Sequence, residues 1–178
     1  INNIGTSFKN LKRLTESINF YNKAIALDPS YAEAYNNLGT VLYEKKDYIK
    51  ALKAYNKAIK IYPEYAEAYY NKAILLKFCN KNTRAKINFK KAILLRNNYP
   101  KAYNSLGNVF HEEKNLHEAI FNYKTALALR RNYPEAYFNL GNALLDLEEF
   151  DEAIEMYKKS LLLRPNYFGV YVNMVLHK

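Results

Sequence analysis

The residues with the clearest capacity for chemistry are asparagines that recur at a fixed interval. Positions 37 and 71 differ by 34, and the same register generates a series broken only by Ser105: Asn3, Asn37, Asn71, Asn139 and Asn173. A primary amide offers both a donor and an acceptor, the pair that a peptide group requires. Asparagine is a poor helix former, so helix propensity does not explain the series. Two interpretations follow: a ladder of amides that grips an extended peptide, or amides that bond neighbouring helices.

The other polar side chains do not form a pattern typical of catalysis. His111 and His117 are six positions apart, which places them on different faces of a helix, and His177 is remote in sequence. Acidic pairs such as Glu112–Glu113 and Glu148–Glu149 lie near predicted turns, where charged residues are usually solvated. The sequence contains no Gly-rich phosphate loop, nucleophile elbow or metal-ligand spacing. We therefore expect no enzyme in this chain, no metal site and no cofactor.

The 34-residue interval runs through the whole chain. It is marked by Tyr31, Tyr65, Tyr99, Tyr133 and Tyr167. Each interval contains two runs of apolar residues at helical spacing with a short polar stretch between them, which predicts two amphipathic helices joined by a turn. The helices are predicted near residues 2–10, 14–27, 32–45, 48–61, 66–79, 82–95, 100–113, 116–129, 134–147, 150–163 and 168–177. We expect residues 1–178 to form a single repeat array of one partial repeat, four full repeats and a final first helix: 1–31, 32–65, 66–99, 100–133, 134–167 and 168–178.

Small residues hold a fixed position in the first helix of each pair. They are Gly5, Gly39, Ala73, Gly107 and Gly141. Glycine inside a helix costs about 1 kcal/mol relative to alanine, so its recurrence predicts that two helices approach closely at this point.

The repeat 66–99 departs from the pattern, with Lys72 in place of leucine, Ala73 in place of glycine and polar Asn82 in an apolar position. We expect this repeat to be the least stable.

These positions resemble the tetratricopeptide repeat, a helix-turn-helix unit of 34 residues with the signature W-x2-L-G-x2-Y…A-x3-F…P. In the repeat 32–65 the signature positions are Tyr35, Leu38, Gly39, Leu42, Ala51, Tyr55 and Pro63. The resemblance implies an all-α, right-handed superhelical solenoid of antiparallel helix pairs. It also implies a scaffold that holds an extended peptide or protein partner on a concave surface formed by the first helices.

The candidate binding residues are the residues of the first helices that the apolar pattern does not assign to packing between helices. If Tyr35, Leu38 and Gly39 point into the array, helical geometry turns Asn36, Asn37 and Thr40 away from it. Besides the asparagine series, the candidate peptide-binding residues are Asn36, Thr40, Tyr70, Asn104, Asn108, Phe138 and Asn142.

The asparagine series is also similar to the superhelical repeat domains of the protein O-glycosyltransferases, the O-GlcNAc and O-fucose enzymes. That resemblance implies a parent protein of this type, with the chain as its recognition region. The chain opens at Ile1 and stops within a predicted helix at Lys178, so we expect it to be part of a longer protein.

Charge is unevenly distributed along a chain whose formal net charge is +10. Residues 66–99 contain eight basic residues and one acidic residue, a net of +7, whereas residues 134–167 contain three basic and seven acidic residues, a net of −4. The alternatives are solvated outer faces, attraction of an acidic partner, and self-association between the basic repeat of one copy and the acidic repeat of another.

Nucleic acid is not an expected partner, because most tyrosines occupy repeat positions and too few remain for a stacking platform. No apolar run reaches the roughly 18–20 residues that cross a membrane, so no membrane association is expected. Cys79 is the only cysteine, which excludes an intramolecular disulfide and is typical of an intracellular protein of the cytoplasm or nucleus.

Overall fold

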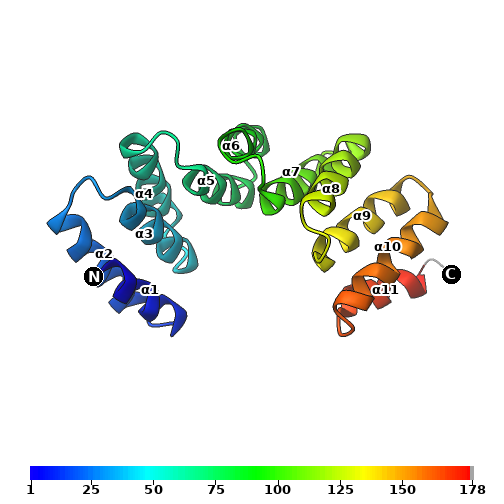
Figure 1. Ribbon diagram of the computed structural model, residues 1–178, viewed down its shortest axis with the longest axis horizontal. Coiled ribbons are helices and arrows are strands. Elements are labelled where there is room, and N and C mark those ends of the chain that lie inside the picture. Colours follow the sequence, from blue (N-terminus) through cyan, green and yellow to red (C-terminus); the bar gives the residue numbers. More distant parts are fainter. Residues whose placement is uncertain (177–178) are drawn as a thin grey trace. The chain divides into compact units, whose positions relative to one another are not determined.

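The computed structural model describes residues 1–176, and every regular element in that range is a helix (Figure 1). The helices are α1 (Asn2–Asn10), α2 (Leu14–Leu27), α3 (Ala32–Glu44), α4 (Tyr48–Ile61), α5 (Ala66–Phe78), α6 (Asn82–Leu95), α7 (Pro100–Glu112), α8 (Leu116–Leu129), α9 (Pro134–Asp146), α10 (Phe150–Leu163) and α11 (Phe168–Leu176). The predicted boundaries agree to within one residue, and the predicted end of the last helix, residue 177, lies outside the described residues. The expected class, an all-α solenoid of antiparallel helix pairs, is confirmed.

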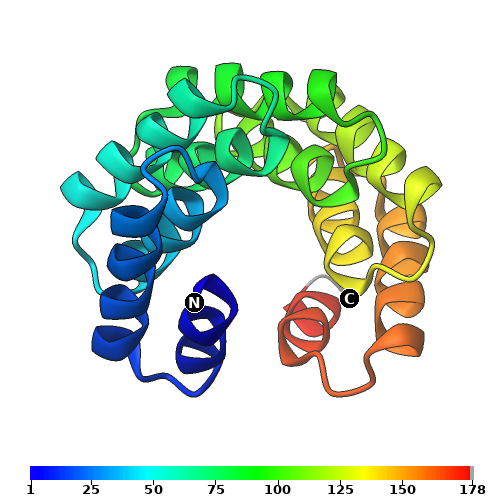
Figure 2. The same cartoon turned by 60° about the vertical axis from the view of Figure 1, so that its left-hand side comes forward.

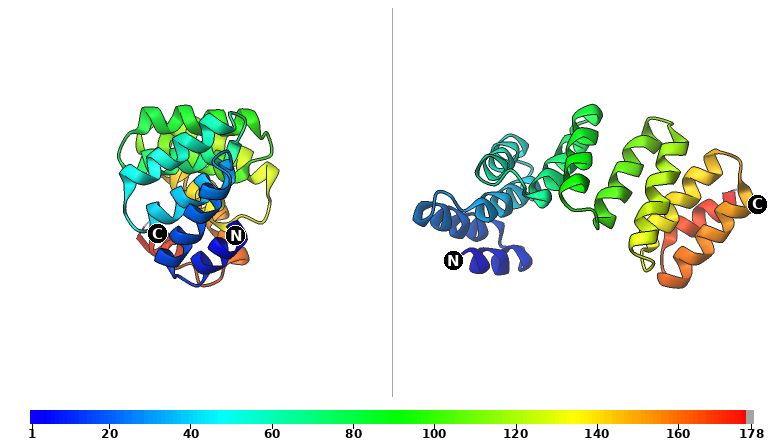
Figure 3. Two further views of the ribbon diagram at one scale, coloured as in Figure 1. Left: turned by 90° about the vertical axis from the view of Figure 1, so that its left-hand side faces the viewer. Right: turned by 45° about the horizontal axis from the view of Figure 1, so that its top comes forward.

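The helices belong to two compact units, Ile1–Arg96 and Asn97–Lys178. In the first unit, α3 packs against α4 of its own pair and against α2 of the preceding pair, and α5 packs against α6 and α4. In the second unit, α9 packs in the same way against α10 and α8. The pairs α3/α4 and α9/α10 can be followed from other directions in Figures 2 and 3. The single array over residues 1–178 stays a prediction.

The turn inside each helix pair is made by a residue in the left-handed region. Lys46, with φ of 64°, ends the first helix of its pair, and its equivalents are Lys12, Asn80, Lys114 and Glu148. Around Lys46 the N–H of Asp47 donates to the carbonyl of Leu42 at 2.9 Å, which closes the end of α3. The side chain of Asp47 then accepts from the N–H of Lys50 at 3.2 Å and caps α4.

Glycines on the first helices lie against tyrosine rings of the second helices. A Cβ atom added to Gly107 would lie 2.6 Å from Cε1 of Tyr123, and the distances at Gly5, Gly39 and Gly141 to their own tyrosines are 2.6 or 2.7 Å. Since Tyr123 is fully buried, its ring fills the space that a side chain on Gly107 would need. The predicted close approach at the glycine position is confirmed.

Candidate functional site

Three members of the asparagine series hydrogen-bond to the preceding first helix. In each case the Nδ2 group donates to the Oδ1 atom of an asparagine 35 positions earlier. The pairs are Asn37 with Asn2 at 3.3 Å, Asn71 with Asn36 at 3.0 Å and Asn139 with Asn104 at 3.1 Å. The structure therefore brings together two candidate columns, the one that contains Asn37 and the one that contains Asn36.

The accepting asparagines are buried between successive first helices. Asn36 is 1% exposed and Asn104 is 6% exposed. The prediction that Asn36 points away from the array is wrong, because a first helix here contacts not only second helices but also the neighbouring first helix. Its carboxamide oxygen satisfies a donor from that neighbour, as buried polar groups require. By contrast, Asn37 and Asn71 are only half-buried.

Three further candidates pair with the tyrosines of the glycine contact. The hydroxyl of Tyr123 donates to Oδ1 of Asn108 at 2.8 Å, and that of Tyr157 donates to Asn142 at the same distance. Thr40 takes the corresponding place beside Tyr55, with 3.5 Å between the two hydroxyl oxygens. Burial raises the pKa of Tyr55 to about 12, so the hydroxyl stays protonated and able to donate.

The repeat 66–99 lacks this bond, and the sequence contains the reason. Phe89 replaces tyrosine there, and Ile74 stands where the other repeats place threonine or asparagine. The donor and the acceptor are thus lost together, and Ala73 replaces the glycine beside them. From the sequence alone, this joint change could have shown that residues 15 positions apart form a pair.

The remaining candidates do not share one arrangement. Asn3 is exposed, and Asn173 donates to Oδ1 of Asn142 at 2.8 Å. The position 35 residues before Asn173 is occupied by Phe138, whose ring packs on Tyr167 with centroids 5.0 Å apart. The ring of Tyr70 lies 5.8 Å from that of Phe89.

The half-buried carboxamides of Asn37, Asn71 and Asn139 retain hydrogen-bonding groups that the contacts between helices do not use. A primary amide has two N–H groups and an acceptor oxygen, so one bond from Nδ2 to the neighbouring helix does not saturate it. That bond also fixes the orientation of the carboxamide. Bonding between helices is therefore observed for Asn37, Asn71 and Asn139, and peptide binding by the same side chains stays a prediction.

The same spacing of 35 residues joins His111 to Asp146 on the surface of the second unit, and Lys114 forms an ion pair with the same carboxylate. Nε2 of His111 lies 3.1 Å from Oδ2 of Asp146, and Nζ of Lys114 lies 2.9 Å from the same oxygen. The hydrogen bond from Lys114 is the main cause that lowers the pKa of Asp146. The cluster is open to solvent and contains no nucleophile, so it is a structural contact.

Two other kinds of site are absent from the part of the chain that the structure describes. It contains no group of three His, Cys, Asp or Glu side chains placed to hold a metal ion. None of its helices combines the length and the apolar character that crossing a membrane requires.

Comparison with protein families identifies the repeat. A model described as TPR repeat matches residues 5–46 and 107–148, and two models of the tetratricopeptide repeat match residues 32–65, 134–167 and 54–87. None of these models describes a catalytic domain or a glycosyltransferase, so the resemblance to the O-glycosyltransferases finds no support. A search of curated protein sequences finds no match.

Solved structures of repeat proteins are similar over almost the whole chain. A crystal structure of MamA is 25% identical, with a TM-score of 0.79 over 91% of this chain and 95% of MamA. YrrB, described as a TPR protein with an unusual peptide-binding site, is 24% identical, with a TM-score of 0.76 over 97% of this chain and 89% of YrrB. PilF of Pseudomonas aeruginosa is 22% identical, with a TM-score of 0.86 over 99% of this chain and 80% of PilF.

Proposed function

The chain belongs to the tetratricopeptide repeat family, whose members are protein-interaction modules, and we propose that its first helices bind an extended segment of a partner protein. The observation that carries the proposal is the half-buried amide held in place by its neighbour, as in Asn71, whose Nδ2 group donates to Asn36 at 3.0 Å. An oriented amide loses little conformational entropy when it binds, which favours affinity.

The spacing of the amides suits an extended backbone. Neighbouring helices pack about 8–10 Å apart, so amides on successive first helices are separated by roughly that distance. An extended chain rises about 3.3 Å per residue, and three residues span about 10 Å. Within each unit, consecutive amides would therefore meet every third peptide group, and the contacts would read the backbone rather than the side chains of the ligand.

The parent protein is a separate matter from this binding mode. An O-glycosyltransferase parent gains no support from the comparisons, and the proposal does not depend on it. Self-association is a second candidate, favoured by the charge difference between residues 66–99, with a net of +7, and residues 134–167, with a net of −4. Opposite charges on two copies would attract each other, and salt would screen that attraction.

The test compares asparagines on the first helices with asparagines elsewhere. Peptides that bind the wild-type chain are selected from a random library, and their affinity is measured for a triple variant, Asn37→Ala, Asn71→Ala and Asn139→Ala. Each amide contributes roughly 0.5–1.5 kcal/mol, so three losses weaken binding by tenfold or more.

The control is the double variant Asn88→Ala and Asn122→Ala. These asparagines are buried on second helices and donate to carbonyls of their own helix at 2.8 Å, so their removal mimics a loss of stability without touching the first helices. Equal weakening in both variants would contradict the proposal, as would unchanged affinity in the triple variant.

A further inference from the structure

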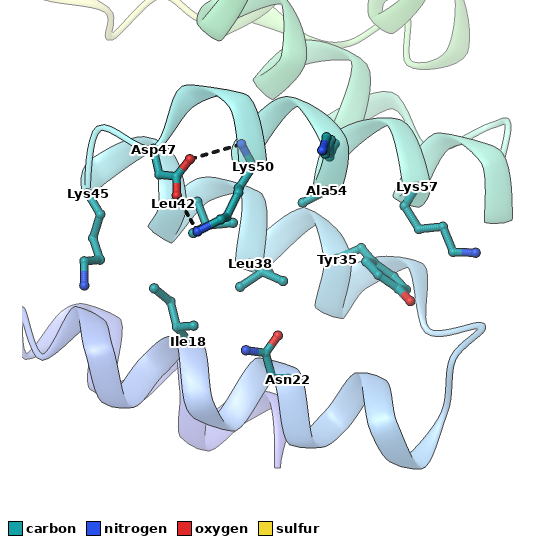
Figure 4. Close-up of a pocket in the computed structure, with 11 residues that line it drawn as sticks. Ile18, Asn22, Tyr35, Leu38, Leu42, Lys45, Asp47, Lys50, Ala54 and Lys57 are labelled. Atoms are coloured by element: carbon teal, nitrogen blue, oxygen red, sulfur yellow. Dashed lines mark hydrogen bonds and ion pairs between the residues drawn. The ribbon is translucent and has the colours of Figure 1, made fainter.

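A groove in the first unit lies between the second helices α2 and α4, with α3 beneath it (Figure 4). Its volume is 720 Å³. Figure 4 shows Ile18 and Asn22 extending from α2 toward α4, with Leu38 of α3 between the two helices. None of the asparagines of the proposed peptide-binding face lines this groove, so it is a separate surface.

The floor of the groove is apolar. It consists of Ile18, Tyr35, Leu38, Leu42 and Ala54. Tyr35 and Leu38 were expected to point into the array, but both retain exposed surface, whereas Leu42 is buried. Apolar atoms that remain in contact with water at the bottom of a groove favour burial by an apolar partner.

The walls of the groove are basic. Lys45, Lys50, Lys53 and Lys57 line it, with Asp47 as the only acid among the lining residues. Asp47 is already paired with Lys50 at 3.0 Å. Among the described residues, neither Lys53 nor Lys57 has a carboxylate partner, and Nζ of Lys57 lies 5.9 Å from the ring centre of Tyr35. Lys50, Lys53 and Lys57 are three and four positions apart, which places them in one row along α4.

This combination of an apolar floor and a basic wall changes from repeat to repeat. The equivalent groove between α4 and α6 has a volume of 340 Å³, and Lys72 replaces the leucine of its floor. In the second unit, the positions 102 residues after Lys50 and Lys53 are Glu152 and Glu155. Only the equivalent of Lys57, Lys159, stays basic, and it is paired with Glu155 at 2.6 Å, so this part of the second unit lacks a basic row for an acidic ligand.

We propose that the groove between α2 and α4 docks an acidic amphipathic helix of a partner protein. α3 already shows that a helix fits between α2 and α4 from one side, since it packs against both. Helices in direct contact lie about 8–10 Å apart, whereas two helices that flank a third are farther apart and leave a trough on the outer side. Leucine-like side chains of the docked helix cover the floor, and its carboxylates, spaced three and four residues apart, meet the lysine row.

The probe is a fluorescein-labelled synthetic helix of about four turns, or about 14 residues, with leucine on one face and glutamate beside it. Its binding to the full chain is followed by fluorescence anisotropy. We expect saturable binding that weakens as salt is raised. The variant Lys53→Glu with Lys57→Glu binds at least tenfold more weakly, and Lys53→Gln with Lys57→Gln falls between this variant and the wild type.

Two controls separate this site from general attraction to a basic protein. The variant Lys101→Glu with Lys158→Glu changes the net charge equally at exposed positions of the second unit and keeps wild-type affinity within about twofold. The triple asparagine variant also binds the probe normally, which distinguishes this proposal from the proposed function. Matched peptides with glutamine for glutamate, or alanine for leucine, each bind at least tenfold more weakly. Absence of binding to the wild type, equal weakening in the two charge-reversal variants, or full binding of either matched peptide would overturn the proposal.

Discussion

Replacing Gly107 with alanine tests the packing between the two helices of a pair. By helix propensity alone, the change would stabilise α7 by about 1 kcal/mol. In the structure, the new Cβ atom would lie 2.6 Å from Cε1 of Tyr123, whereas carbon atoms in good contact are about 3.5–4.0 Å apart. The ring would have to move by about 1 Å, yet it is fully buried and its hydroxyl is bonded to Asn108 at 2.8 Å.

The expected result of Gly107→Ala is a net loss of up to about 2 kcal/mol, because overpacking a core typically costs about 1–3 kcal/mol and the gain in propensity offsets about 1 kcal/mol of it. For a chain of 178 residues, that loss lowers the melting temperature by up to about 8 °C. Gly107→Leu should destabilise more strongly.

A rescue variant makes the test specific to the tyrosine contact. The repeat 66–99 combines Ala73, Ile74 and Phe89 at the equivalent positions. Transferring this combination as Gly107→Ala, Asn108→Ile and Tyr123→Phe should recover much of the lost stability, because the ring is no longer held by its hydrogen bond. The assay is thermal unfolding followed by circular dichroism. A melting temperature that rises in Gly107→Ala would refute the account of the glycine position.

Three further predictions concern turns and charges. Lys46→Gly should stabilise the chain by about 0.5–1 kcal/mol, since glycine adopts the observed φ of 64° without strain. The control variant Lys45→Gly, at φ of −77°, should not stabilise the chain. The free energy of unfolding of both variants is measured by chemical denaturation. Asp146→Asn should cost about 0.2–1 kcal/mol at neutral pH. Because the pKa of Asp146 is lowered in the folded chain, its contribution is present above the ordinary aspartate pKa of about 3.9 and disappears as the pH falls through the folded-state value, so melting curves of wild type and variant should converge in acid. If two copies associate through oppositely charged repeats, sedimentation velocity should show an oligomer at low salt that dissociates at high salt, and a monomer at all salt concentrations would exclude this association.

The helices were predictable because each repeat gives the same local signals several times. Apolar spacing located α4, and the recurrent glycine predicted the contact later found between Gly107 and Tyr123. A contact between a small residue and a large ring can be predicted from the sequence when both recur at fixed positions of each repeat.

The orientation of Asn36 could not be predicted in the same way. The helical pattern was interpreted as one buried face and one exposed face, but α3 contacts not only α2 and α4 but also the neighbouring first helices α1 and α5. These additional neighbours bury positions that a two-sided pattern assigns to solvent. The spacing of 35 residues that joins Asn71 to Asn36, and Asp146 to His111, becomes informative only once the stacking of first helices is known.

The groove between α2 and α4 was not predicted because residues that line it were expected to be buried and are partly exposed. Tyr35 and Leu38 match the repeat signature, and signature residues were assigned to the core. Whether such a residue is covered depends on how far apart the second helices lie, and that separation is a property of the assembled repeats rather than of any single one. The row of lysines on α4 can be recognised in the sequence, but the exposure of the apolar residues beside it, Tyr35 and Leu38, cannot.

The central claim, that amides of the first helices bind an extended backbone, is tested most directly by the side-chain NH₂ signals of the asparagines in ¹⁵N NMR spectra. A peptide selected on the wild-type chain is titrated, and the signals of Asn37, Asn71 and Asn139 are compared with those of Asn88 and Asn122. We predict that the three first-helix amides shift with the peptide concentration while the two second-helix amides stay in place. A peptide that binds with all three first-helix signals unchanged would contradict the claim.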